Sequence, residues 1–408
     1  MTAPLTGLTI LDLSRVLSGP YCTMLAADMG ARVIKIEHPV RGDDTRAWGP
    51  PFLDGESSYY LSINRNKESV AVDFKTPEGR AIVHALAAKA DVLIENFRPG
   101  TLDGIGLGYA ELSARHPRLI YVSVSGFGQN GPRRDEPGYD AVAQAEGGLM
   151  SITGDAGGSA VRLGVAIADI ASGLFAFQGL LLALIARGTS GRGQLVDVSL
   201  LDSVAALLTY QASRYLLAGD IPRRTGNRHS AIAPYDTFEA ADGVLVLAVG
   251  NDSQWRSFCR VIEAPHLDEP QYRTNASRVE HYDVLRPILA TILRRRPLDT
   301  LIAKLREAGV PCGAVRNVAE ALQDPQIAAR AMIETLNHPT LGALRVLGIP
   351  VKLSETPGSV RTAPPLLGQH TRQVLLNDLQ MTAADVDRLI GAGVCAAPAP
   401  GRGQVDEG

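Results

Sequence analysis

The chain has few of the residues that build covalent or metal cross-links. Its four cysteines (Cys22, Cys259, Cys312 and Cys395) lie far apart, without the CxxC spacing of a zinc or redox motif. The eight histidines are scattered, so the sequence predicts neither a metal site nor a Ser-His-Asp set. The first residues, MTAPLTGLTI, lack the basic segment and apolar core of a secretory leader. We therefore expect a protein of the reducing cytoplasm without a metal.

The sequence also lacks an excess of charge of either sign. Forty basic residues against forty-three acidic residues leave a net charge of -3, which gives no reason to expect a nucleic-acid or membrane partner. Residues 163–186 carry a single charge, that of Asp169, and are long enough to cross a membrane. They are rich in Gly, Ala and Ser and are flanked by segments typical of soluble structure, so we expect a buried core helix preceded by a loop.

Strands and helices alternate over the first 200 residues. LTILDLS and ARVIKIE read as strands on either side of a helix, YCTMLAADMG, with Gly19-Pro20 as the break before it. A second unit follows, in which Thr76 caps a helix that begins at Pro77 and DVLIE is the next strand. This pattern predicts an α/β fold with a Rossmann-like parallel sheet covered on both faces.

The length of 408 residues favours a second, smaller domain. After IPRRTGNRHS, a hairpin around Ala241-Asp242-Gly243 is followed by two apolar helical segments, which predicts an α+β unit. The segments that we predict are a large domain at 1–205, a linker at 206–225, a small domain at 226–330, a linker with the C-terminal return to the large domain at 331–395, and a disordered tail at 396–408.

Asp169 is the first candidate for chemistry, because an unpaired carboxylate is costly to bury among small apolar residues. One interpretation makes it the N-cap of the helix that follows. The other makes it a nucleophile, and the two are compatible. A carboxylate at a helix N-terminus is expected to stay ionised and to attack a reactive carbonyl that reaches it.

The first βα turn, SRVLSGPYCT, lacks the glycine fingerprint of a dinucleotide site, although Glu37 stands where a ribose-binding acid would. A nicotinamide oxidoreductase is therefore the weaker interpretation. The cations Arg65, Lys67 and Lys75 lie near strand ends and suit either phosphate binding or an ordinary solvated surface.

Two further segments suit a binding pocket. In ENFRPG, Asn96 and Phe97 can bond to and stack on a flat heterocycle, although Phe97 is equally suited to the core. The glycine-rich stretch from 126 to 154 favours either a closely approached backbone beside a pocket or a plain surface loop. Within it, Tyr139 and Asp140 are candidates to orient a substrate, and Asp140 alternatively caps the next helix.

Taken in order, these blocks resemble the class III CoA-transferases, the family that includes formyl-CoA transferase, carnitine CoA-transferase and the related acyl-CoA racemases. The resemblance spans nearly the whole chain and rests on LDLSRVLSGPYCTMLAADMGARVIKIE, GDDTRAWGPP, SINRNKESVAVDFKTPEG, DVLIENFRPGTL, GFGQNGP, IADIASG and PPLLGQHT. It implies a large Rossmann-like domain, a smaller domain and a homodimer of two interlocked subunits.

The resemblance also implies the chemistry. Asp169 would form a mixed anhydride and then an aspartyl-CoA thioester, with acyl-CoA and a small carboxylic acid as substrates and no permanently bound cofactor. The residues implied to bind coenzyme A are Val16, His38, Val72, Lys75, Asn96, Phe97, Arg98 and Ile105. Those implied to lie near the acid are Leu17, Tyr139 and Asp140.

Several positions depart from the family pattern. His38 and Gly104 stand where relatives often have arginine, and Arg46 and Arg98 are candidates to replace those phosphate contacts. Leu17 replaces a glutamine of formyl-CoA transferase, which disfavours a formyl or oxalyl substrate.

The acceptor acid and the reaction type leave alternatives open. We expect succinyl-CoA and a short dicarboxylate, whose second carboxylate would pair with Arg15, Arg46, Arg162 or Arg228. The racemase branch carries a GHD motif, whereas this chain has Gly138-Tyr139-Asp140, which favours transfer. A 2-methylacyl-CoA racemase and a non-catalytic CoA-binding protein are the alternatives.

Overall fold

A computed structural model describes residues 2–398, which divide into two compact units. Within the described residues, the larger unit comprises 2–149, Leu163–Ala212 and 325–398, and the smaller comprises Met150–Arg162 and Ser213–Asp324. Most of the tail that we predict to be disordered, 399–408, lies outside the described residues. The predicted domain boundaries stay a prediction.

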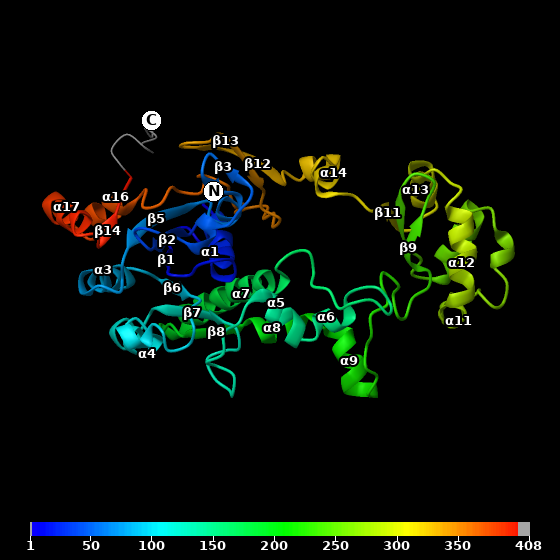
Figure 1. The fold of residues 1–408 in the computed structure, drawn as a ribbon, viewed down its shortest axis with the longest axis horizontal. Coiled ribbons are helices and arrows are strands. Elements are labelled where there is room, and N and C mark those ends of the chain that lie inside the picture. The colour runs from blue at the N-terminus through cyan, green and yellow to red at the C-terminus, as the bar shows by residue number, and fades with distance from the viewer. Residues whose placement is uncertain (1, 399–408) are drawn as a thin grey trace. The chain divides into compact units, whose positions relative to one another are not determined.

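The larger unit is built on a seven-stranded sheet, of which six strands are drawn from blue to green and β14 in red in Figure 1. Six strands are parallel, and β14 joins the edge antiparallel to β5. The spatial order is β14 (Cys395–Ala396), β5 (Lys67–Val72), β2 (Arg32–Glu37), β1 (Thr9–Asp12), β6 (Val92–Glu95), β7 (Ile120–Ser125) and β8 (Leu195–Ser199). Apart from β14, this is the doubly wound order, which reverses direction between β1 and β6. The expected α/β fold with a large parallel sheet is confirmed.

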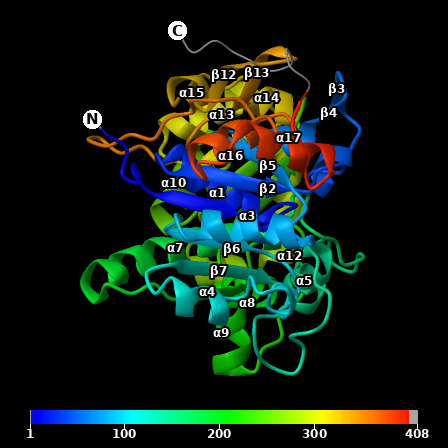
Figure 2. The same ribbon diagram turned by 90° about the vertical axis from the view of Figure 1, so that its left-hand side faces the viewer.

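Helices cover both faces of this sheet because the strands bury apolar side chains on alternate sides. In β1, Leu11 packs on the face covered by α3 (Pro77–Ala87), α4 (Tyr109–Arg115), α16 (Thr371–Asn377) and α17 (Ala383–Gly391). Ile10 packs on the opposite face, under α1 (Ser18–Asp28), α5 (Asp140–Glu146), α7 (Ile167–Ser190) and α8 (Leu200–Leu207). Figure 2 shows α3, α16 and α17 beside β5 and β2.

The smaller unit has its own core. Its three-stranded sheet has the order β11 (Cys312–Ala314), β10 (Val244–Ala248), β9 (Tyr235–Glu239), and the predicted hairpin between β9 and β10 is confirmed. The helices that pack there include α10 (Asp252–Val261), α12 (Tyr282–Leu293) and α13 (Leu298–Glu307). Trp255 and Phe258 are fully buried among them.

The remaining elements are short. They are η1 (Asp44–Ala47), β3 (Phe52–Leu53), β4 (Glu56–Ser57), α2 (Ser58–Ile63), η2 (Asp103–Ile105), α6 (Leu149–Ile152), α9 (Thr209–Ala218), η3 (Pro265–Leu267), α11 (Asn275–Glu280), α14 (Val318–Leu322), α15 (Pro325–Ala329), β12 (Ile333–His338) and β13 (Gly342–Leu347). The cap and helix start predicted at Thr76 and Pro77 are confirmed, since the Thr76 hydroxyl accepts the N–H of Gly79.

Two predictions about helices need correction. Gly19 and Pro20 do not precede the first helix, because α1 already begins at Ser18 and proline is tolerated in a first turn, where N–H groups have no helical partner. The expected core helix, α7, is buried on one face only. It packs on α1, β7 and β8, while Leu182 and Ile185 on another side are exposed. By length and composition alone, α7 would also suit a membrane span.

Charged residues are buried inside the larger unit as bidentate pairs. Arg65 donates from Nε and Nη2 to the two carboxylate oxygens of Asp28, at 3.0 and 2.6 Å, and Asn66 donates to the same carboxylate. Arg65 also reaches the backbone carbonyl of Leu347 in β13. The pair therefore connects α1 to a strand that lies more than 300 residues away in the sequence.

Because an unpaired charge is costly in this interior, Asp28→Ala is expected to lower the free energy of unfolding by about 3–5 kcal/mol. The matched control is Asp387→Ala, which removes the exposed partner of Arg372 and should cost less than about 1 kcal/mol. Guanidinium unfolding followed by circular dichroism measures both. Equal effects of the two substitutions would contradict this account of the buried pair.

Candidate active site

Asp169 lies in the first turn of α7, and it is not the N-cap that the sequence suggested. The helix begins at Ile167, and its N-cap, Ala166, has no side chain that can accept a hydrogen bond. The carboxylate of Asp140 acts in its place, because Oδ1 of Asp140 accepts the N–H of Ala168 at 2.8 Å. Asp140 is the first residue of α5 and does not cap that helix either. It therefore fixes the N-terminus of α7 from a neighbouring helix.

The Asp169 carboxylate itself has no hydrogen-bond partner among residues 2–398. Burial, reinforced by the negative charge of Asp140, raises its pKa to about 7. The sequence suggested that the helix N-terminus keeps this group ionised, whereas its burial in the structure opposes ionisation. No helix cap or cation compensates for its burial, which leaves the ionised form reactive.

An apolar cluster lies beside the first turn of α7. Leu17, Met24 and Ile63 are buried there, and Ile170 and Tyr59 pack against them. Burial and the charges of Asp169 and Asp140 raise the pKa of Tyr59 to about 12, so its hydroxyl is neutral. Tyr59, on α2, was not singled out from the sequence, and its position between Ser58 and Tyr60 in a short apolar helix carried no signal.

Close packing of α1 against α7 sets the width of this region. A Cβ atom at Gly173 would lie 2.7 Å from the backbone oxygen of Ser18 and 3.1 Å from Cδ1 of Tyr21. Only a residue without a side chain allows this approach. Gly173 follows Asp169 by one helical turn, so the contact places the carboxylate next to the turn that precedes α1.

That turn lies at the point where the strand order reverses, which is where doubly wound folds bind ligands. Asn96, after β6, accepts the N–H of Arg15 at 2.9 Å and donates to its carbonyl at 2.6 Å. Val16 has a left-handed backbone, with φ of 70°, and donates its N–H to Oδ1 of Asp43 at 3.2 Å. The structure thus brings together Val16 and Asn96, which were both predicted to bind coenzyme A.

The other residues predicted to bind coenzyme A differ in how deeply they are buried and in what they contact. Phe97 is half-buried, stacks edge-on with Phe74 and has the Arg15 guanidinium 5.3 Å from its ring centre. Ile105 packs against the same core cluster as Phe97. Val72 is fully buried, so only its backbone can reach a ligand.

Lys75 and Arg98 are exposed, whereas Leu17 belongs to the apolar cluster. His38 is half-buried, and its Nδ1 accepts the N–H groups of Val40 and Arg41. The His38 ring therefore forms its hydrogen bonds within the loop that follows β2.

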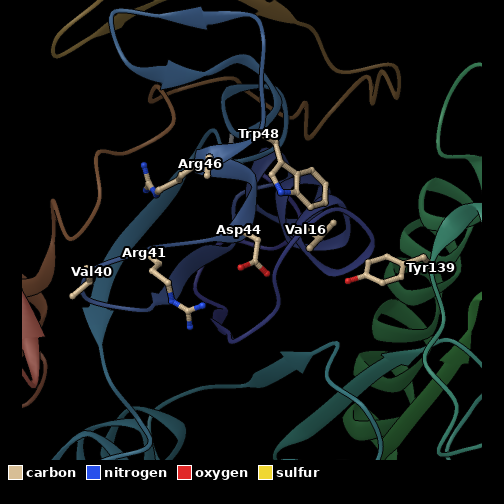
Figure 3. Close-up of a pocket in the computed structure, with 8 residues that line it drawn as sticks. Val16, Val40, Arg41, Asp44, Arg46, Trp48 and Tyr139 are labelled. Atoms are coloured by element: carbon tan, nitrogen blue, oxygen red, sulfur yellow. The ribbon is translucent and has the colours of Figure 1, made fainter.

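A cavity of about 690 Å³ opens at this edge of the sheet (Figure 3). It is lined by Val16, Val40, Arg41, Asp44, Arg46, Ala47, Trp48 and Tyr139. Three residues that were considered from the sequence, Val16, Arg46 and Tyr139, are among them, and Asp169 is not. Trp48 links the two regions, because its ring packs edge-on against Tyr59 at 5.2 Å.

Most cations that were considered for phosphate binding are already paired. Arg46 bonds to Glu37 at 2.7 Å and to Tyr60, so it does not replace a phosphate-binding arginine, and Glu37 is not available to a ribose. Lys67 is buried against Asp12 and donates to Asn64. Lys67 and Arg65 neither bind a phosphate nor lie on a solvated surface, because each forms an ion pair in the interior.

Two further arginines that were considered for a second carboxylate are paired with carboxylates near the surface. Arg15 bonds to Asp44 at 3.0 Å, and in the smaller unit Arg228 bonds to Asp283 at 2.7 Å. Within the described part of the chain, no group of three or more His, Cys, Asp or Glu side chains is arranged to hold a metal ion.

Comparison with known proteins decides the family. The profile of CoA-transferase family III matches residues 5–371. The chain belongs to this family of enzymes. It is 42% identical to the succinyl-CoA:glutarate CoA-transferase of Mus musculus, over 96% of this chain and 90% of that protein. It is 38% identical to the succinyl-CoA–D-citramalate CoA-transferase of Chloroflexus aurantiacus, over 95% and 96% of the two chains.

A solved structure agrees with the family assignment. The crystal structure of a CAIB/BAIF family protein from Brucella suis superposes with a TM-score of 0.84 at 38% identity, covering 93% of this chain and 100% of that one. The resemblance to class III CoA-transferases that the sequence motifs indicated is confirmed.

The raised pKa of Asp169 predicts a pH dependence for CoA transfer. If the ionised carboxylate is the reactive form, the rate should rise through a pKa of about 7 and fall about tenfold for each pH unit well below it. Asp140→Asn removes the like charge and keeps an oxygen for the N–H of Ala168, so the rise should move to lower pH. A kcat–pH profile measures both.

The control for this profile is Glu136→Gln, a carboxylate in the same loop region that is paired with Arg133 on the surface. It should leave the profile unchanged. A profile that moved equally in both variants, or not at all in Asp140→Asn, would remove Asp140 as the cause of the raised pKa.

Proposed function

We propose that this protein transfers coenzyme A from succinyl-CoA to a short dicarboxylic acid through the carboxylate of Asp169. The observation that carries the proposal is that the carboxylate of Asp169 is partly buried and has no hydrogen-bond partner within residues 2–398. The buried carboxylates of Asp28 and Glu37, in contrast, have cationic partners. An accessible carboxylate without a partner is suited to nucleophilic attack.

The proposed reaction exchanges one bond at a time. An oxygen of Asp169 attacks the thioester carbon of succinyl-CoA, and the C–S bond breaks to give a mixed anhydride and the CoA thiolate. The thiolate then attacks the aspartyl carbonyl, which releases succinate and leaves an aspartyl-CoA thioester. The acceptor carboxylate attacks that thioester, and the thiolate released attacks the acceptor's acyl carbon. The products are the new acyl-CoA and the free Asp169 carboxylate.

The residues around Asp169 have separate tasks in this scheme. Asp140 fixes the first turn of α7, so the nucleophile is held in place. The apolar side chains of Leu17, Met24 and Ile63 limit water, which would hydrolyse the anhydride. The neutral Tyr59 hydroxyl, close to both carboxylates, is available to donate a hydrogen bond to a carbonyl oxygen.

The choice of substrates rests on relatives. The proteins from mouse and from Chloroflexus aurantiacus are named for succinyl-CoA with glutarate and with D-citramalate, and both acceptors are short dicarboxylic acids. At 42% and 38% identity over nearly the whole chain, we assign the same donor and the same class of acceptor here. The transfer conserves one thioester bond, so no metal or redox cofactor enters the scheme.

The proposal includes the residues implied to bind coenzyme A and a cytoplasmic location. Val16, Asn96 and Phe97 are supported by their place at the reversal of the strand order. All four cysteines are free, as the reducing cytoplasm allows.

Incubation with succinyl-CoA and glutarate should give glutaryl-CoA and succinate, detected by mass spectrometry. Asp169→Asn is expected to reduce this transfer by at least about a thousandfold, since it removes the nucleophile and keeps the shape. Hydroxylamine added during turnover should convert Asp169 of the wild type to a hydroxamate, seen as a mass change in its peptide.

Asp202→Asn, at an exposed carboxylate in the first turn of α8, is the matched control and should transfer normally. Full activity of Asp169→Asn would remove the nucleophile assignment. Exchange of an α-hydrogen with deuterated solvent in the absence of an acceptor acid would instead identify a racemase.

We propose an interlocked homodimer as the working form. Leu174, Leu182 and Ile185 expose a large apolar area on α7, which suits a subunit contact. Interlocked subunits cannot separate without unfolding. A mixture of tagged and untagged protein should therefore form no mixed dimers under native conditions and should form them after unfolding and refolding. A monomer in sedimentation analysis would overturn the proposal.

A further inference from the structure

The loop between β2 and η1 presents one arginine, Arg41, from a closed turn. The N–H of Gly42 donates to the carbonyl of His38 at 2.8 Å, and Nδ1 of His38 accepts the N–H groups of Val40 and Arg41 at 3.2 and 3.3 Å. Gly42 has a left-handed backbone, with φ of 64°. His38 thus closes the turn as an Asn or Asp side chain would.

Both ends of this loop are fastened to the sheet. Glu37, the last residue of β2, accepts the N–H of Asp43 at 3.0 Å. Asp43 is buried and paired with Lys35 at 2.9 Å. Because residues 37 and 43 are both fixed, the position of the Arg41 backbone varies little, and a ligand that binds its side chain meets a preorganised site.

The charges of the adjoining cavity leave Arg41 without a counterion. Asp44 is neutralised by Arg15, and Arg46 by Glu37. The guanidinium of Arg41 has no hydrogen bond or ion pair with any group in the part of the chain that the structure describes. In Figure 3 it points away from the Arg46 guanidinium. The lining of the cavity therefore carries one positive charge in excess.

We infer that Arg41 binds a phosphate group of coenzyme A and that His38 acts as a positioning residue for Arg41. The inference rests on the proposed function for the identity of the ligand. A guanidinium matches a phosphate with two parallel hydrogen bonds, and an arginine at the open end of a cavity suits the charged end of a long ligand.

A carboxylate of the acceptor acid is the competing ligand for the same guanidinium. Val40, the neighbour of Arg41, is 82% exposed, so this side of the cavity faces solvent and does not face the apolar cluster beside Asp169. A short acid has to approach Asp169 for reaction. This geometry favours the phosphate.

The test measures binding of coenzyme A by calorimetry, independently of turnover. Arg41→Ala is expected to weaken binding about ten- to hundredfold, the range for a hydrogen bond to a charged group, and Arg41→Lys should recover part of the loss. The matched control is Arg192→Ala, an exposed arginine in the loop after α7, which should bind within about twofold of wild type.

Dephospho-coenzyme A separates the two phosphate sources. If the penalty of Arg41→Ala disappears with this ligand, Arg41 binds the 3′-phosphate, and if the penalty persists, Arg41 binds the diphosphate. Unchanged affinity of Arg41→Ala for coenzyme A overturns the inference. A rise confined to the KM of the acceptor acid overturns it as well. A wild type that binds coenzyme A but transfers nothing would contradict the proposed function and leave this assignment intact.

The role of His38 is tested by rescue. His38→Ala removes the acceptor that closes the turn and should raise the KM for succinyl-CoA about fivefold or more with kcat unchanged. His38→Asn supplies an oxygen near the place of Nδ1 and should restore the KM. If His38→Asn remained as weak as His38→Ala, the ring would act on the ligand directly and the positioning role would be wrong.

Discussion

The buried ion pair between Lys35 and Asp43 supports the turn on which the site is built. Lys35 also donates to the carbonyl of Ser14 at 2.7 Å, and Asp43 accepts the N–H of Val16. Burial alone would lower the pKa of Lys35, but the carboxylates of Asp43 and Asp12 raise it. Both partners therefore stay charged, and removal of either would leave an uncompensated charge inside the sheet edge, at a cost of about 3–5 kcal/mol.

Against this background, Asp169 is the exception. Asp12, Asp28, Glu37 and Asp43 all have cations or several donors as partners, and burial of these carboxylates is compensated. For Asp169, burial and the negative charge of Asp140 both oppose ionisation. These four carboxylates have partners inside the larger unit, whereas the carboxylate of Asp169 is available for a bond to a substrate. Packing elsewhere in the fold offsets the free energy that is lost by burying the Asp169 carboxylate.

Features encoded by neighbouring residues could be predicted from the sequence. The parallel sheet followed from the alternation of apolar strands with helices, and the cap at Thr76 from its place before Pro77. Asp169 stood out because a lone carboxylate in an apolar run requires an explanation. The prediction that Asp169 is the N-cap was wrong, because Asp140 caps α7. Asp140 lies 28 positions before Ala168, whose N–H it accepts, and belongs to another helix.

Pairings between distant residues could not be predicted. Arg65 and Asp28 are 37 residues apart, and nothing in the local sequence of SINRNK separates a buried ion pair from a surface cation. Arg46 was considered for a ligand for the same reason, although Glu37 already holds it. Arg41 was overlooked because its importance lies in having no partner, and that property appears only when the partners of its neighbours are known.

Gly173 has no reactive atom, but the close contact of α1 and α7 that it allows determines the position of Asp169 one turn away. A single methyl group added at position 173 would push α1 and α7 apart and would displace the first turn of α7, which carries the Asp169 carboxylate. Natural variation at position 173 should therefore be constrained as tightly as variation among the groups that take part in bond making, although no chemical probe would ever label it.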